Sequence, residues 1–141
     1  MREVDRIMTD DLGIDLPLMM ESAGRHLAYL GRLRYLDGDA TDRHAVVLAG
    51  PGANLCAAPT IALDVPSGVD ASTGVAHDPS IRAAVTLTLA IPKVGLRLPS
   101  VAAAVGELYL ADIGIPPHVL ARAGIDNAQS LFASEEIVRI W

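Results

Sequence analysis

The chain has 141 residues, a net charge of -6 and an apolar content of 51%, which suit one domain with its own hydrophobic core. Its acidic pI, near 5.0, argues against nucleic acid or an anionic membrane surface as the main partner, because both require clustered Lys and Arg. Gly and Pro interrupt every long apolar stretch, so we expect no membrane-spanning segment, and the charged start predicts no signal peptide.

Two amphipathic helices are predicted first. One should end at Gly13 and bury the apolar residues that recur at helical spacing, namely Val4, Ile7, Met8 and Leu12. The other should begin near Pro17 and end at 37–39, because Pro suits a first turn and Asp-Gly-Asp breaks a helix. The apolar face of the second helix should comprise Met20, Ala23, Leu27 and Leu30.

Four strands are predicted next, at 44–49, about 60–64, 83–91 and 107–111. We expect them to be neighbours in that order. Only about nine residues separate the first two, which is short for a parallel crossover, so they are either antiparallel or joined by an extended loop. A short helix should cover 118–123 and end at Gly124, and Ser134 with two glutamates would start a last, solvated helical turn.

Residues 61–70 read Ile-Ala-Leu-Asp-Val-Pro-Ser-Gly-Val-Asp and are the most informative segment. An apolar run ends on Asp64 and breaks at once into a turn. In an open α/β sheet, ligands collect beyond the carboxyl ends of the strands, so Asp64 is a candidate functional group. The alternative is structural, since Asp and Ser beside a Pro-Gly turn often bond only nearby backbone N–H groups.

Several motifs follow one another in the order found in a known family. They are 1–6 (Met-Arg-Glu-Val-Asp-Arg), 20–25 (Met-Glu-Ser-Ala-Gly-Arg), 50–52 (Gly-Pro-Gly), 64–70 (Asp-Val-Pro-Ser-Gly-Val-Asp), 73–74 (Thr-Gly), 92–95 (Pro-Lys-Val-Gly) and 112–116 (Asp-Ile-Gly-Ile-Pro). With these, the chain resembles the NAD(P)H-hydrate epimerase family, also called the YjeF N-terminal domain family, which includes the apolipoprotein A-I binding protein.

The resemblance implies an α/β fold: a Rossmann-like three-layer α/β/α sandwich, here with a reduced sheet of about four strands and two N-terminal helices. It also implies nicotinamide cofactor repair, in which the R and S epimers of NADHX and NADPHX are interconverted. The resemblance further implies a homodimer, and many family members are fused to a dehydratase. Residues 1–141 would form one domain, with 128–141 a possible linker to an absent dehydratase domain.

Site residues follow from the same resemblance. Asp64 matches the family's substrate-binding aspartate, proposed to act in catalysis, and Ser67 and Asn54 match potassium ligands. Gly52 and Lys93 are expected on the substrate side, although a solvated lysine after a strand is the commoner situation. The four histidines lack metal-ligand spacing, so we expect them in surface or capping roles. The single Cys56 fits a cytoplasmic location.

One departure bears on activity. The family's glycine-rich loop is replaced here by Ala53-Asn54-Leu55-Cys56-Ala57-Ala58, and a segment carrying two strands and another loop is missing between about 54 and 60. We therefore expect epimerase activity to be weak or lost. The alternatives are a non-catalytic dimerising or interaction module, and a fragment of a bifunctional epimerase/dehydratase.

Overall fold

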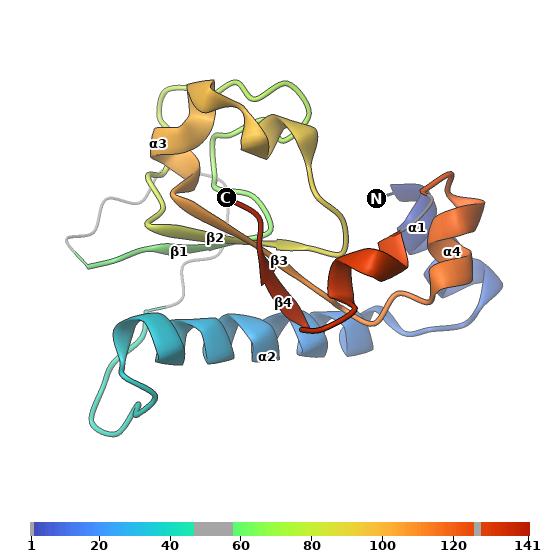
Figure 1. The fold of residues 1–141 in the computed structure, drawn as a ribbon, viewed down its shortest axis with the longest axis horizontal. Helices are drawn as coiled ribbons and strands as arrows, with labels where there is room; N and C mark the ends of the chain where they lie inside the picture. Colours follow the sequence, from blue (N-terminus) through green and yellow to red (C-terminus); the bar gives the residue numbers. More distant parts are fainter. Residues whose placement is uncertain (1, 47–57, 126–127) are drawn as a thin grey trace.

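The computed structural model describes residues 2–46, 58–125 and 128–141. A four-stranded sheet lies at its centre (Figure 1), with strands β1 (Ile61–Leu63), β2 (Val85–Leu89), β3 (Glu107–Ala111) and β4 (Ile137–Arg139) in that spatial order. The first three are parallel, and β4 is antiparallel to β3. The predicted α/β architecture with about four strands is confirmed.

One face of the sheet is covered by the long helix α2 (Leu16–Tyr35), which runs beneath the strands in Figure 1. Leu30 of α2 packs against Val85 and Leu87 of β2. The helix starts with Pro17 in its first turn and ends before Asp37 and Gly38, both of which have a positive φ. These boundaries agree with the prediction.

The other face of the sheet is covered by short helical segments, namely η2 (Val94–Arg97), η3 (Pro99–Val101) and α3 (Ala102–Val105). Leu96 and Val105 bury Leu108 of β3 beneath them. The side chain of Thr86 faces this layer and donates a hydrogen bond of 2.7 Å to the carbonyl of Val105. The sheet therefore lies between two helical layers, as the three-layer sandwich predicts.

A third part of the core joins the N-terminal helix to the segment after β3. Helix α1 (Arg2–Arg6) continues into a π-helical turn, η1 (Ile7–Asp11), and both pack against α4 (Pro117–Arg122), as Figure 1 shows. Leu12 is 39% exposed rather than buried, so its assignment to the core was wrong. Its N–H bonds the carbonyl of Ile7, five residues back, and this wider turn carries Leu12 off the buried face.

The buried face of α2 includes Ala23 and Leu30, as predicted, but not Met20. Met20 is 65% exposed, whereas Met19 and His26 are 5% exposed and share the buried face with Ala23 and Leu30. The observed spacing of four, three and four residues is helical, as predicted; the error was the assignment of Met20 to the buried face in place of Met19. The expectation of a surface or capping role for His26 was also wrong.

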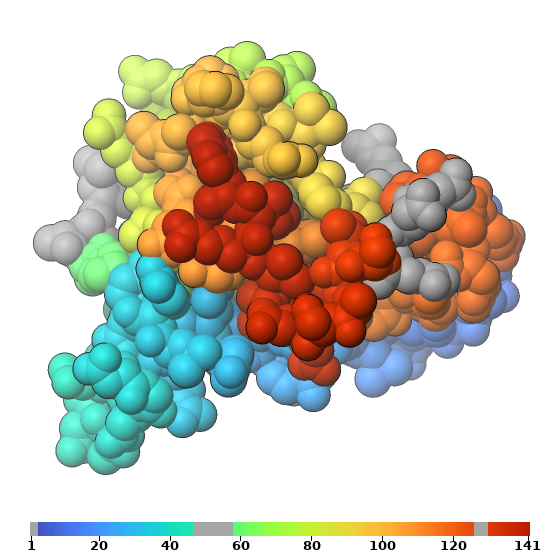
Figure 2. All heavy atoms as spheres, in the orientation of Figure 1, coloured from blue at the N-terminus to red at the C-terminus, as the bar shows by residue number. Residues whose placement is uncertain are grey.

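The remaining corrections concern the two edges of the sheet. Residues 44–46 are irregular, and the rest of the predicted strand 44–49 lies outside the described residues. The fourth strand is instead β4, and Glu135 and Glu136 precede it rather than starting a helix. The C-terminal residues lie across the front of the molecule, as Figure 2 shows. Across residues 2–46, 58–125 and 128–141, no helix is long and apolar enough to span a membrane.

Candidate functional site

Two neighbouring strands end in the same unusual turn. Asp64, after β1, has a φ of 66°, and Ala90, after β2, has a φ of 64°. At each, the next residue donates its N–H to the carbonyl of the preceding one, at 2.9 Å after β1 and 2.7 Å after β2. This bond, with a positive φ, is typical of the rare γ-turn, a strained conformation for residues other than Gly. Strain is thus concentrated at the edge of the sheet where parallel strands end.

The γ-turn aims the Asp64 carboxylate at the neighbouring strand. Its Oδ1 accepts hydrogen bonds from the Leu89 N–H at 3.1 Å, from Lys93 Nζ at 2.5 Å and from Thr88 Oγ1 at 3.5 Å. The side chain is nevertheless 41% exposed, and no group in the described part of the chain donates to Oδ2. The carboxylate is therefore held by one oxygen and open at the other. These three bonds of the carboxylate all lie on Oδ1, and a functional role for Asp64 stays a prediction.

Lys93 lies beside this carboxylate and is largely buried. Its side chain is only 12% exposed, so the alternative of a solvated lysine is wrong. The ammonium donates to Asp64 Oδ1, to Thr88 Oγ1 at 2.8 Å and to the Leu89 carbonyl at 3.4 Å. An ammonium has three protons, and each has an acceptor within the protein.

The turn after Asp64 is fixed mainly by its backbone. The carbonyl of Ser67 accepts the N–H of Ile81 at 2.9 Å. Gly68 has a φ of 88°, and a Cβ at this position would lie 2.6 Å from the carbonyl oxygen of Pro79, so only Gly fits. Ser67 thus stands on rigid backbone, three residues after Asp64.

Asp70 closes the same turn. Its Oδ1 accepts the N–H of Thr73 at 3.0 Å and of Ser72 at 2.7 Å, and these two bonds hold the pKa of the Asp70 carboxyl below its ordinary value. The side chain acts as a structural cap, and the motif's second aspartate has a different role from its first.

The Pro-Lys-Val-Gly motif packs against this loop, backbone to backbone. The N–H of Gly95 donates to the carbonyl of Ala71 at 2.8 Å, and a Cβ on Gly95 would lie 2.5 Å from that oxygen. This close approach places Lys93, two residues earlier, over the end of β1. Motifs that are separate in the sequence therefore build one site around Asp64.

Two of the other expected site residues are not described by the structure. Gly52 and Asn54 lie outside the described residues, so a potassium site made by Asn54 and Ser67 stays a prediction. Within the described ranges, no three His, Cys, Asp or Glu side chains gather as metal ligands.

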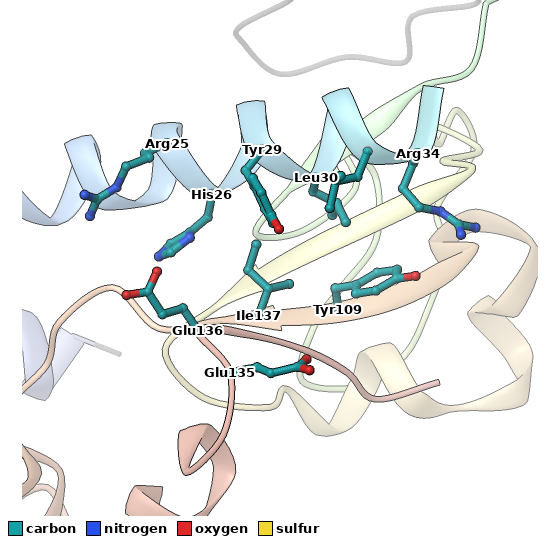
Figure 3. A pocket seen from close by; sticks show the side chains of 10 residues that line it. Arg25, His26, Tyr29, Leu30, Arg34, Tyr109, Glu135, Glu136 and Ile137 are labelled. Atoms are coloured by element: carbon teal, nitrogen blue, oxygen red, sulfur yellow. The ribbon is translucent and has the colours of Figure 1, made fainter. Parts of the chain in front are cut away.

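The described surface has two hollows. One, of about 310 Å³, is lined by Pro92, Val94, Arg97 and Leu98, the first two of which are the sequence neighbours of Lys93. A larger groove of about 620 Å³ lies between α2 and the C-terminal segment, where Tyr29 and His26 point toward Ile137 and Glu136 (Figure 3). Neither hollow is lined by an expected site residue, so we assign the candidate site to the sheet edge at Asp64 and Lys93 on chemistry rather than on the size of a hollow.

Comparison with known proteins identifies relatives over part of the chain. Residues 53–95 match the family described as YjeF-related protein N-terminus. The chain is 51% identical over 80 residues to the NAD(P)H-hydrate epimerase of Dehalogenimonas lykanthroporepellens, a match that covers 57% of this chain and 31% of that relative. It is 42% identical over 84 residues to the bifunctional NAD(P)H-hydrate repair enzyme Nnr of Salinibacter ruber, covering 60% of this chain and 16% of the relative.

A further relative is the NAD(P)H-hydrate epimerase of Rhodopirellula baltica, 38% identical over 73 residues, with 52% of this chain and 30% of the relative covered. The chain thus spans less than a third of the length of these curated relatives. The matches confirm the resemblance to the NAD(P)H-hydrate epimerase family over the matched region.

Proposed function

We propose that this chain, whose residues 53–95 belong to the YjeF N-terminal family, is an epimerase-like protein that acts on the R and S epimers of NADHX or NADPHX. The observation that supports this most is the Asp64 carboxylate, fixed through Oδ1 and open at Oδ2 where the parallel strands end. An acid–base group held in this way on rigid backbone is what proton transfer to a bound ligand requires.

The chemistry assigned to Asp64 is proton transfer at the ring hydroxyl. When the carboxyl donates a proton, the hydroxyl leaves as water and the nicotinamide ring becomes cationic. The resulting carboxylate then takes a proton from water as it adds to the opposite face, which inverts the centre with no net change in atoms. The negative carboxylate beside the ring also stabilises the cation. The hollow flanked by Pro92 and Val94 is the surface on which the ligand would lie.

We expect the rate of this chain alone to be low. The glycine-rich loop that would face Asp64 is altered at 54–58, and the chain covers only 31% of the epimerase to which it is 51% identical. To test this, purified chain would be incubated with R-NADPHX and the R to S ratio followed against buffer. A ratio that relaxes faster with the chain supports the proposal, and a rate equal to the spontaneous one refutes it.

A potassium ion is proposed as a cofactor, with Ser67 and Asn54 as ligands. A monovalent cation held by hard oxygen atoms would offset the charge of a dinucleotide pyrophosphate. Potassium should then raise the melting temperature more than lithium at equal ionic strength, and Ser67→Ala should remove the difference. Equal melting temperatures in the two salts would contradict a potassium site.

A second candidate function, that of an interaction module, is favoured by exposed apolar side chains on α2. Leu18, Tyr29 and Leu33 are 63%, 56% and 52% exposed and lie on one side of the helix, because their spacings of 11 and 4 residues are helical repeats. We propose that a second copy of the chain covers this side in a homodimer, while a fused dehydratase domain would adjoin the C-terminal end.

Light scattering after size-exclusion chromatography tests the homodimer. The chain should elute as a dimer, and Leu33→Glu should elute as a monomer, because the substitution buries a charge in the interface. A monomer at all concentrations would contradict it, whereas a dimer without epimerase activity would favour the interaction module.

We also propose a cytoplasmic location, which the single cysteine of the chain supports.

A further inference from the structure

The ammonium of Lys93 is fully engaged by the protein. Its three acceptors are Asp64 Oδ1, Thr88 Oγ1 and the Leu89 carbonyl, and the side chain is 12% exposed. The Lys93 ammonium is poorly suited to bind a ligand directly, because its three N–H donors already have acceptors and its side chain is largely buried. We propose instead that Lys93 and Thr88 are positioning residues, which fix Oδ1 of Asp64 so that Oδ2 alone meets the ligand.

Thr88 connects the two charged groups. Its side chain is fully buried, and its hydroxyl accepts from Lys93 Nζ at 2.8 Å while donating to Asp64 Oδ1 at 3.5 Å. A hydroxyl has one proton and two lone pairs, so it makes both bonds at once. Valine would match its shape but leave the ammonium one acceptor short in a place that water scarcely reaches.

All the contacts to the carboxylate fall on the same oxygen. The Leu89 N–H, at 3.1 Å, adds a backbone donor to those from Lys93 and Thr88. Rotation of the Asp64 carboxylate that moves Oδ1 away from these donors would break all three bonds together. The strained backbone of Asp64, with a φ of 66°, brings the carboxylate within reach of these donors.

The chain offers a matched control on the same strand. Thr86 is also fully buried and uses its hydroxyl to donate to the Val105 carbonyl at 2.7 Å. Thr86→Val therefore removes a comparable buried hydrogen bond without touching the carboxylate. Thr88→Ser keeps the hydroxyl and should restore whatever Thr88→Val loses.

The first readout is independent of activity, because Lys93 is the only lysine in the chain. Lysine labelled with ¹⁵N at the side chain gives one Nζ signal from the full-length protein. We expect slow exchange of its protons with water in the wild type, in Thr86→Val and in Thr88→Ser, and fast exchange in Thr88→Val. The amide proton of Leu89 should shift in Thr88→Val and Asp64→Asn but not in Thr86→Val.

The second readout rests on the proposed epimerase function. Thr88→Val should lower kcat about 10-fold and leave KM within about 2-fold, because a displaced acid slows the chemistry more than binding. A wild-type protein without activity would refute the proposed function but leave the NMR result decisive for positioning.

Three outcomes would overturn the positioning role. The first is a wild-type Lys93 signal that exchanges as fast as free lysine, and the second is Lys93 and Leu89 signals unchanged by Thr88→Val. The third is a Lys93→Met variant with raised KM and normal kcat, which would make Lys93 a ligand-binding group.

Discussion

At the scale of single residues, the two aspartates of the 64–70 motif bond different partners. Asp70 Oδ1 accepts two backbone N–H groups of its own turn, whereas Asp64 Oδ1 accepts the Leu89 N–H of the neighbouring strand and the Lys93 ammonium. The position of Asp64 at the end of a strand was predictable, since an apolar run followed by Pro and Gly indicates it. The burial of Lys93 was not, because it depends on a γ-turn and on contacts between residues distant in the sequence.

Gly68 is required by its surroundings, and this gives the first prediction. Gly68→Ala should lower the free energy of unfolding by about 2 kcal/mol or more, because its Cβ would meet the Pro79 carbonyl at 2.6 Å and its φ is positive. Urea unfolding followed by circular dichroism measures the change.

Gly24 provides the control for that prediction. It lies inside α2, and a Cβ there would meet nothing within 4 Å. Gly24→Ala should therefore stabilise the protein by about 0.5–1 kcal/mol, through helix propensity alone. If both substitutions had the same effect, the close approach at Gly68 would not be the cause.

At the scale of elements, one ion pair ties the N-terminal helical turn to α4. Asp11 Oδ2 accepts a hydrogen bond of 2.5 Å from Arg122, and this bond holds the pKa of the Asp11 carboxyl below its ordinary value of 3.8. A carboxyl whose pKa is lowered by folding stabilises the protein above its unfolded pKa. That contribution is lost as the pH falls through the lowered value.

Asp11→Asn should accordingly lower the urea midpoint at pH 7, and the difference from wild type should shrink as the pH falls below 3.8. High salt should reduce it as well, because the pair is partly exposed. A difference that stays constant between pH 7 and pH 2 would contradict this role for the ion pair.

Strand β4 was missed by the sequence analysis for a physical reason. It has only three residues, and its stability comes from pairing with β3, a contact between distant segments that no local pattern encodes. Strand β3 was predicted with its observed bounds because it alternates and is framed by turns. On α2 the exposed Met20 was predicted to be buried, since methionines at positions 19 and 20 fit an apolar face equally well.

Removal of residues 134–141 should uncover β3. The lost hydrogen bonds would include Ile140 N–H to Leu108 O, Leu108 N–H to Trp141 O and Asp112 N–H to Glu136 O, together with those of the pairing between β3 and β4. At roughly 1 kcal/mol for each bond, we expect a loss of more than about 3 kcal/mol in unfolding free energy, together with aggregation through the exposed edge. Arg139→Ala, a change at an exposed side chain, is the control and should unfold close to the wild-type midpoint. An undiminished midpoint after truncation would show that β4 contributes little.

At the scale of the whole molecule, the described residues supply the surroundings of Asp64, while the chain matches only part of its relatives. The turn after Asp64, the Pro-Lys-Val-Gly motif and the ends of β1 and β2 form one connected unit. The chain nevertheless spans under a third of the named epimerases it matches. The unit around Asp64 is thus the part of the chain on which the proposed epimerase activity can be tested.

The most direct test compares Asp64→Asn with Asp70→Asn in the conversion of R-NADPHX to its S epimer. Asparagine keeps the shape of each side chain and removes its ability to exchange a proton, and of the two aspartates only Asp64 pairs with Lys93 where the parallel strands end. We predict a rate above the spontaneous one for the wild type and Asp70→Asn, and the spontaneous rate for Asp64→Asn. A wild-type rate no higher than that in buffer, or an Asp64→Asn variant as fast as the wild type, would contradict the account.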